Sequence, residues 1–354
     1  MIPSSIQVTE DIGNSIALFL KHNKYNKIGI LVDSNTEQYC YAILKHHLPA
    51  HTVCQIPEGE ENKNLHSCET IWRWLTAEKF DRKSLLINLG GGVIGDMGGF
   101  CAASFKRGID FVNIPTTLLA MVDASIGGKL GIDFEGFKNH IGFFQDPKLV
   151  IIYAPFLDTL PPQQVKSGFA EIIKHTLIAD ASYWPVLQET QLEQTEWQDL
   201  ICHSIGIKSR VVEQDPHEKG LRKILNFGHT IGHAIESFYL ETDNKLLHGE
   251  AIAIGMWCEA FLATEKGYLS SVEFTAISQF IQKVYGDLNI FEQDFPKIIA
   301  YCLQDKKNED DSIRCVLLKT IGEAIFDIAV DENAIMKSLY SYKQEQAVSK
   351  AKKS

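Results

Sequence analysis

Four short apolar runs in the first half of the chain constrain its fold more than any other feature. They are IGILVD at 28–33, SLLINL at 84–89, IDFVNI at 109–114 and KLVIIY at 148–153. Each run is rich in β-branched residues, and helical or turn-like sequence separates them. Strands that are buried on both faces of a parallel sheet have this pattern. The first half is therefore predicted to be an α/β domain.

The second half of the chain is predicted to be mostly helical. After two consecutive prolines at 161 and 162, apolar residues recur with helical period. One strand-like run, IRCVLL at 313–318, follows, and the polar tail at 343–354 is expected to fray. The expected helices cover 165–179, 198–214, 224–239 and 249–267. We expect two domains, residues 1–157 and 158–354, because single cores seldom grow beyond about 300 residues.

Charge and composition exclude several classes of protein. The net charge is −11, with no long basic run, so nucleic acid is not expected as a partner. No apolar run approaches the roughly 18 residues that a membrane span needs, and the N-terminus lacks the layout of a signal peptide. The eight cysteines are scattered without a C-x-x-C pair. This pattern predicts a cytoplasmic protein with reduced, mostly buried thiols.

A glycine-rich segment, GGGVIGDMGG at 90–99, directly follows the run at 84–89. Glycine allows backbone amides to approach a pyrophosphate closely, and a helix that starts there would point its positive end at the phosphates. This spacing favours nucleotide binding. It differs from the usual G-x-G-x-x-G, however, and a tight strand-to-helix turn, with glycines for packing only, is the alternative.

Histidines and an acid in the second half suggest a metal site. His229 and His233 are four residues apart and share one helix face, His248 opens another helix, and Glu171 lies in a third. Three imidazoles and a carboxylate are enough for a catalytic zinc site with an open position. Spacing alone nominates His229 and His233 as paired ligands. The alternative is that these histidines are ordinary core or surface groups.

Several cations lie in otherwise apolar or glycine-rich segments: Lys129, Lys138, Lys174, Lys208 and Arg222. Converging lysine and arginine side chains suit a phosphorylated or carboxylated small molecule. Taken singly, each is more often a solvated side chain with an apolar stem. Only together with a nucleotide loop and a metal site do they favour an anion pocket.

Long motifs in the chain resemble the 3-dehydroquinate synthase family of sugar phosphate cyclases. They are GGGVIGD, RGIDFVNIPTTLLAMVDASIGGK, FKNHIG, SGFAEIIKH, GLRKILNFGHTIGHAIE and LHGEAIAIGM, within residues 28–325. The resemblance implies an N-terminal Rossmann-like, NAD-binding α/β domain and a mostly α-helical C-terminal metal-binding domain. More distantly, glycerol dehydrogenase and iron-dependent alcohol dehydrogenases share this fold.

The resemblance also implies roles for individual residues. The metal, zinc or cobalt, falls on Glu171, His229 and His248, and His233 becomes a substrate contact instead of a ligand. Catalytic roles fall on Glu218, His233, Lys174 and Lys129. Cofactor contacts fall on Asp33, Asn35, Glu60, Lys63, Gly92, Val93, Ile94, Gly95, Asp96, Thr116, Thr117, Asp123, Lys129, Lys138, Phe156, Leu157, Asp158 and Thr159. Substrate contacts fall on Arg107, Asp123, Lys129, Asn139, Lys174, Lys208, Arg222, Asn226, His233, Lys306 and Lys307.

The activity implied is conversion of 3-deoxy-D-arabino-heptulosonate 7-phosphate to 3-dehydroquinate and phosphate, a step of the shikimate pathway to aromatic amino acids. It would proceed by transient oxidation with NAD, phosphate elimination, reduction and aldol cyclisation. Arg107 matches an arginine that reaches a neighbouring subunit, which implies a homodimer. The alternatives are a related sugar phosphate cyclase or a metal-dependent polyol dehydrogenase of the same fold. The chain departs from the family after GGK, where Leu130, Gly131, Ile132 and Asp133 replace T-A-V-N.

Overall fold

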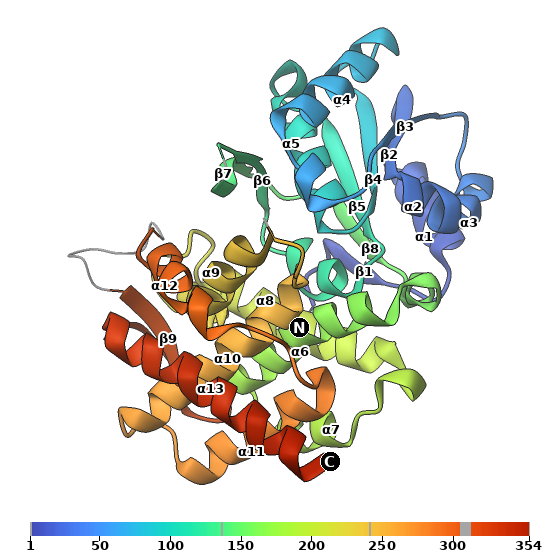
Figure 1. Cartoon of the computed structure of the whole chain (residues 1–354). Helices are drawn as coiled ribbons and strands as arrows, with labels where there is room; N and C mark the ends of the chain where they lie inside the picture. Colours follow the sequence, from blue (N-terminus) through green and yellow to red (C-terminus); the bar gives the residue numbers. More distant parts are fainter. Residues whose placement is uncertain (1, 136, 241, 305–312, 354) are drawn as a thin grey trace. The chain divides into compact units, whose positions relative to one another are not determined.

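The computed structural model describes every residue except 1, 136, 241, 305–312 and 354 (Figure 1). Lys306 and Lys307, two predicted substrate contacts, lie outside the described residues. The chain forms two compact units. Unit 1 contains residues 1–165 and 196–209, and unit 2 contains 166–195 and 210–354. The assignment of cofactor binding to residues 1–157, and of metal and substrate binding to residues 158–354, stays a prediction.

Unit 1 is built on a parallel sheet of six strands in the order β1-β8-β5-β4-β2-β3. All four predicted strands are present, as β2 (Lys27–Asp33), β4 (Ser84–Gly90), β5 (Asp110–Pro115) and β8 (Leu149–Ile152). Sequence patterns missed β1 (Ile6–Val8) and β3 (Thr52–Ile56), which are short edge strands. They also missed the antiparallel hairpin of β6 (Lys129–Phe134) and β7 (Phe137–Phe144).

Helices on both sides bury the sheet of unit 1 (Figure 1). They include α1 (Ile12–His22), α4 (Leu65–Ala77) and α5 (Gly92–Ser104), with short turns α2 (Ser34–Thr36) and α3 (Ala42–Leu44). On one face, α4 and α5 pack over the sheet around Leu31, Leu86 and Phe111. Leu130 and Ile132 of β6 complete that core. The departure from the family at 130–133 is thus part of a buried strand.

Unit 2 is mainly helical. Its helices are α7 (Trp184–Glu189), α9 (His229–Leu240), α10 (His248–Glu265), α11 (Ser271–Tyr285), α12 (Phe295–Gln304) and α13 (Glu332–Lys353), with most of α6 (Pro162–Ala179) and the end of α8 (Trp197–Gln214). A hairpin of β9 (Ile313–Thr320) and β10 (Glu323–Val330) completes it. The strand predicted at 313–318 is confirmed as β9, whereas β10 was missed.

Two predictions for unit 2 are wrong in detail. The tail, which was expected to fray, is instead helical, because α13 continues through Lys353. The helix predicted at 224–239 is two elements, a 3-10 helix at Leu221–Asn226 and α9. The helical conformation is interrupted between them at Gly228, whose φ is +78°. An apolar period continues through such a break, so periodicity alone does not reveal it.

Helix α10 is the centre of unit 2. Residues 251–260 are all buried, and α9, α11, α13 and β9 surround the helix. A helix that is apolar on every side belongs in a core. Its start carries His248, so a rigid element positions this side chain.

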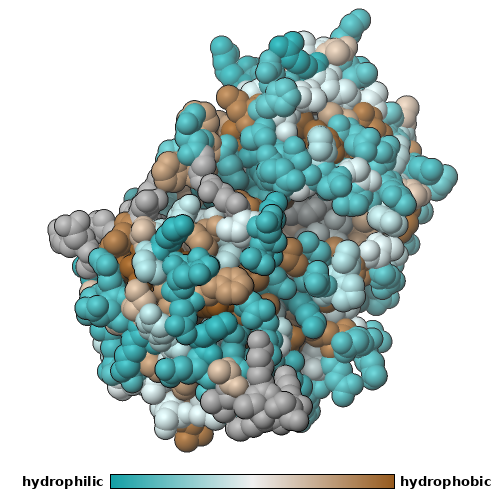
Figure 2. All heavy atoms as spheres, viewed as in Figure 1, coloured by the Kyte–Doolittle hydropathy of each residue, from teal (hydrophilic) through white to brown (hydrophobic). Residues whose placement is uncertain are grey.

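The predicted fold class, a Rossmann-like α/β domain followed by a mostly helical one, is confirmed. In the described part of the chain, no helix is long and apolar enough to span a membrane. Hydrophilic side chains cover most of the face in Figure 2, with apolar residues scattered between them. The eight cysteines are free thiols and all except Cys202 are buried, which confirms the expectation that most of them are buried.

Candidate functional site

Predicted cofactor residues of unit 1 gather where parallel strands end. Asp33 ends β2, and its carboxylate accepts a hydrogen bond from the Thr36 amide, while Asn35 is exposed beside it. The glycine segment follows β4, and Thr116 follows β5. The short helix after β8 contains Phe156, Leu157, Asp158 and Thr159. The carboxyl ends of neighbouring parallel strands are the usual place for a ligand in an α/β sheet.

The glycine segment forms a tight connection from β4 to helix α5. Helix α5 begins at Gly92 and contains Val93, Ile94, Gly95 and Asp96 in its first turns. Thr116 donates its amide to the Gly90 carbonyl at 3.0 Å, so the ends of β4 and β5 are joined. A Cβ at Gly91 would lie only 3.1 Å from the Thr117 side chain. Backbone amides at this helix start are placed to bind an anion.

Lys63 connects predicted cofactor and substrate residues. Its buried ammonium lies 2.6 Å from Asp96 Oδ2 and 2.7 Å from Asn139 Oδ1. Burial lowers the pKa of Lys63, but the carboxylates of Asp96 and Glu60 raise it above its usual range. Lys63 is therefore a fixed positive charge. Nearby, Lys138 lies 3.7 Å from Glu60.

Asp133, a departure from the family, helps to build this part of unit 1. Its amide donates to the Lys63 carbonyl at 2.8 Å, and its carboxylate accepts from the Asn139 amide at 2.7 Å. Sequence reasoning named Asp133 only as a departure.

Lys208 and Asp123 also meet, as the resemblance predicts. Lys208 Nζ lies 2.7 Å from Asp123 Oδ1 and 2.6 Å from the Asp123 carbonyl oxygen. Lys129 opens β6 and is exposed. Arg107 is not brought to these residues: it follows α5 at the edge of the sheet where β5 begins, opposite the glycine segment, and it is exposed.

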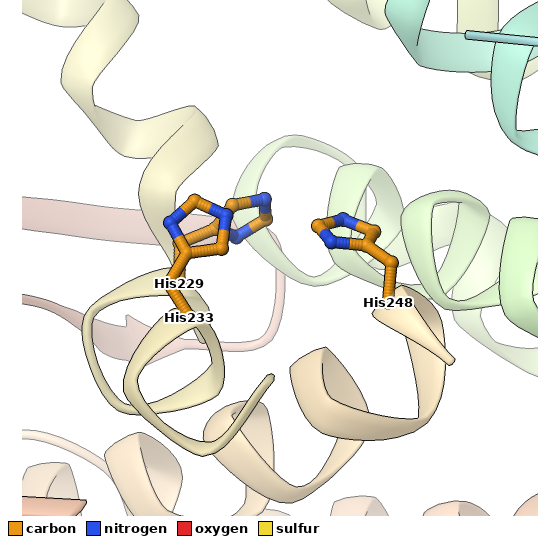
Figure 3. A group of neighbouring side chains, drawn as sticks. All are labelled: His229, His233 and His248. Carbon is orange, nitrogen blue, oxygen red and sulfur yellow. The ribbon is translucent and has the colours of Figure 1, made fainter. Parts of the chain in front are cut away.

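In unit 2, three imidazoles approach one another (Figure 3). His229 and His233 project from α9, and His248 faces them from the start of α10. One nitrogen from each ring lies within 4.8 Å of the other two. Glu171 of α6 joins them: its Oε1 lies 3.6 Å from His229 Nε2 and 3.5 Å from His248 Nε2. The sequence therefore nominated the correct side chains as neighbours.

Hydrogen bonds fix the orientation of two of these rings. His229 Nδ1 lies 3.1 Å from the Phe227 carbonyl oxygen, and His248 Nδ1 lies 3.1 Å from Glu236 Oε2. A carbonyl or carboxylate oxygen only accepts, so both Nδ1 atoms carry the proton. Both Nε2 atoms consequently face Glu171, in the orientation that a metal ligand requires.

Buried charges govern the titration of this cluster. Glu171 is fully buried and forms an ion pair with Lys174, which is 1% exposed. Burial, and then Lys174, lower the pKa of His229 well below its usual range. Burial also lowers the pKa of His248, but Glu236 and Glu171 outweigh this effect and raise it to about 10. A metal ion would displace the second proton of His248, since metal binding requires the neutral ring.

A separate loop of unit 2 groups three predicted residues. Asn226 Nδ2 donates to Glu218 Oε1 at 2.6 Å, and Arg222 donates to the Pro216 carbonyl at 2.6 Å. Asp215, which sequence reasoning missed, organises the loop by accepting the amides of Lys219, Gly220 and Arg222.

Glu218 and Asn226 line a cavity of about 620 Å³. Charged side chains that sequence reasoning did not select share it, among them Lys223, Arg314 and Asp327. Lys223 Nζ and Asp327 Oδ2 are 2.6 Å apart. Arg314 of β9 and Asp327 of β10 reach the loop only because this hairpin packs against it, so no local sequence signal identifies them. The polar lining suits a small hydrophilic molecule.

Comparison with known proteins identifies the family. The sequence profile for the N-terminal part of 3-dehydroquinate synthase matches residues 53–167, and the profile for its C-terminal part matches 168–308. The chain belongs to the 3-dehydroquinate synthase family. The 3-dehydroquinate synthase of Parabacteroides distasonis is 38% identical over 97% of this chain and 99% of its own. That of Sulfurovum sp. is 40% identical over 90% of this chain and 91% of its own.

Solved structures share the fold of this family member. ValA, a 2-epi-5-epi-valiolone synthase from Streptomyces hygroscopicus with NAD+ and Zn2+ bound, has a TM-score of 0.87 at 24% identity, covering 98% of both chains. A 2-deoxy-scyllo-inosose synthase complexed with carbaglucose-6-phosphate, NAD+ and Co2+ has a TM-score of 0.81 at 25% identity, covering 94% and 95%. Glycerol dehydrogenase from Schizosaccharomyces pombe has a TM-score of 0.66 at 14% identity, covering 99% of this chain and 92% of its own, which agrees with the distant fold relationship.

Proposed function

We propose that this chain is a 3-dehydroquinate synthase, a carbon–oxygen lyase that converts 3-deoxy-D-arabino-heptulosonate 7-phosphate to 3-dehydroquinate and phosphate. The observation that carries the proposal is the meeting of Glu171 with the Nε2 atoms of His229 and His248 in a member of this family. Two oriented imidazoles and a buried carboxylate are the donor set of a catalytic zinc centre.

Zinc or cobalt fits this donor set. Glu171, His229 and His248 would hold the ion, which would act as a Lewis acid on a substrate oxygen. The ammonium of Lys174 beside Glu171 favours the ionised carboxylate that a ligand needs. The ring centroid of His233 lies 4.9 Å from that of His229 and 5.7 Å from that of His248. His233 is thus near enough to hold a substrate group beside the three ligands.

NAD fits the edge of the sheet in unit 1, where it would supply a reversible hydride acceptor. The amides at the start of α5 would bind its pyrophosphate, and Asp33 lies at the end of β2, as for an acid that binds a ribose hydroxyl. Thr116 and Thr117 follow the neighbouring strand. Lys63 would keep positive charge beside this region.

The remaining predicted residues would bind the anionic substrate. Arg222 offers the planar fork of donors that matches a phosphate group. Asn226 and Glu218 hold each other at the wall of the cavity, so their side chains are oriented before substrate arrives. Such pre-organisation is how a protein favours elimination and ring closure without supplying a reactive group of its own. Lys129, Lys174 and Lys208 would add positive charge for the substrate's carboxylate and phosphate.

One assay separates this function from its alternatives. Purified protein is mixed with NAD, zinc and the heptulosonate phosphate, and both inorganic phosphate and NADH are measured over time. A synthase releases phosphate without accumulating NADH, because the hydride returns to the product. Steady accumulation of NADH would instead identify a polyol dehydrogenase. A sibling cyclase would leave this substrate unchanged.

We also propose that the protein is a homodimer that works in the cytoplasm. Arg107 supports the first statement, because it is exposed and lies at the opposite edge of the sheet from the predicted cofactor residues. The free cysteines support the second, since oxidising compartments favour disulfides.

A further inference from the structure

We propose that Glu236 and Glu259 are positioning residues. Each lies on one of the helices α9 and α10 and holds the metal-binding segment of the other helix. Glu236 lies on α9 and holds His248 at the start of α10. Glu259 lies on α10 and holds the start of α9, where His229 is located. This inference rests on the metal site of the proposed function and adds two carboxylates that contribute no ligand atom.

Glu236 acts on His248 directly. Its Oε2 accepts the Nδ1 hydrogen at 3.1 Å, and its side chain is 9% exposed. The same ring directs Nε2 at Glu171 Oε1, 3.5 Å away. A carboxylate on the far nitrogen fixes the tautomer and ring orientation of a metal-binding histidine and makes it a stronger ligand. Glu236 is therefore placed to set how His248 meets the metal.

Glu259 acts on the backbone around His229. It is fully buried, and its two oxygens accept the Gly228 amide at 2.6 Å and the Ile231 amide at 3.4 Å. These amides belong to the break before α9 and to its first turn, which carry the positive end of the helix dipole. The residue before the break, Phe227, gives the carbonyl that fixes the His229 ring.

Close packing makes this arrangement rigid. A Cβ on Gly255 of α10 would overlap the Gly228 carbonyl oxygen, so the two backbones touch. Gly228 itself has φ +78°, a conformation that side chains disfavour. The start of α9 consequently has one position relative to α10. Each helix supplies one of the two proposed imidazole ligands and the carboxylate that holds the segment of the other ligand. The metal site therefore requires both helices to be docked.

The alternative explanation is that both carboxylates only stabilise the fold. Measurements of metal affinity distinguish this explanation from a positioning role. Metal-free protein is titrated with zinc against a competing chelator, and the melting temperature of the metal-free protein is recorded. We expect Glu236→Ala to weaken zinc binding about 10- to 100-fold. Glu236→Gln should lose less, because its amide oxygen still accepts the Nδ1 hydrogen. The control is Glu265→Ala, in the last turn of α10, where the half-exposed carboxylate pairs with Lys337.

The absorption spectrum of the cobalt-loaded protein gives a readout that fold stability does not move. At saturating cobalt, Glu236→Ala should change the ligand-field bands, whereas Glu236→Gln should restore most of the native spectrum. Glu259→Gln keeps one of two hydrogen bonds and should lower both zinc affinity and melting temperature. If Glu259→Gln does not fold, the zinc affinities and cobalt spectra of the Glu236 variants test the inference.

Native zinc affinity and cobalt spectrum in a folded Glu236→Ala variant would overturn the inference. If the unsubstituted protein itself binds no zinc, the proposed metal site fails first, so the two failures are distinguishable.

Discussion

His233 is the residue for which spacing and family resemblance disagree. Its helix position makes it the partner of His229, and the structure does bring its ring beside both other imidazoles. The oriented Nε2 atoms of His229 and His248, however, both face Glu171. A spacing rule identifies which side chains share a face, but it does not identify where each nitrogen points.

Alanine substitutions decide the role of His233. His248→Ala removes a ligand and should lower zinc affinity by at least about 100-fold, together with turnover. His233→Ala should retain zinc and lose turnover. Chelator competition and phosphate release measure the two effects. Equal loss of zinc in both variants would make His233 a ligand.

The thiols provide a second test at this scale. Burial raises the pKa of Cys54 to about 11 and also raises that of Cys202, and only Cys202 is partly exposed. Since the thiolate is the reactive form, the native protein should react slowly with a thiol reagent, first at Cys202. All eight cysteines should react after unfolding. Cys202→Ser should remove the first phase; rapid reaction of several native thiols would contradict the burial.

At the scale of elements, the junctions between helices were harder to predict than the helices. The break at Gly228 divides a continuous apolar period, and it exists because α10 approaches there closely enough to require a glycine. The strands β1 and β10 were missed for a related reason. Neither has the continuous apolar run of a central strand, and each becomes a strand by pairing with β8 or β9.

Gly249 tests the contact between α10 and α6. Its amide donates to Ser167 Oγ at 2.9 Å, and a Cβ there would overlap the Ser167 carbonyl oxygen. Gly249→Ala should therefore destabilise the protein by about 1–3 kcal/mol and weaken zinc binding, because it separates His248 from Glu171. Urea unfolding and zinc titration measure these effects.

The matched control for Gly249→Ala is Gly206→Ala. Gly206 lies within α8 with nothing within 4 Å of an added Cβ. The substitution should be neutral or stabilise the protein by up to about 1 kcal/mol through helix propensity. If both variants behave alike, the close approach of α10 to α6 is not the cause.

At the scale of the whole molecule, residues 196–209 show that the order of segments along the sequence does not determine which structural unit each segment joins. They follow the predicted boundary, yet they belong to unit 1, and Lys208 within them meets Asp123. A change from strand-like to helix-like sequence shows where one kind of secondary structure ends and another begins. It does not show to which structural unit a later helix belongs.

Mixed dimers test the proposed assembly. Arg107→Ala and Lys174→Ala proteins should each be nearly inactive. If Arg107 serves the partner's site, random mixing should restore about a quarter of native activity, because half of the dimers then carry one complete site. Phosphate release before and after subunit exchange measures this. Lack of recovery, with exchange verified, would place Arg107 in its own subunit's site.

The sequence by itself determined the fold class, the four central strands, the glycine connection and the histidines that meet. These depend on local composition, on short apolar runs and on the helical period of 3.6 residues, which a short window contains. Only the tertiary structure decided the break before α9, the lining of the 620 Å³ cavity and the crossed pairing of Glu236 and Glu259 with the two imidazole segments. Those features depend on which backbones approach closely and which buried polar atoms then need partners, and both are settled by packing between distant parts of the chain.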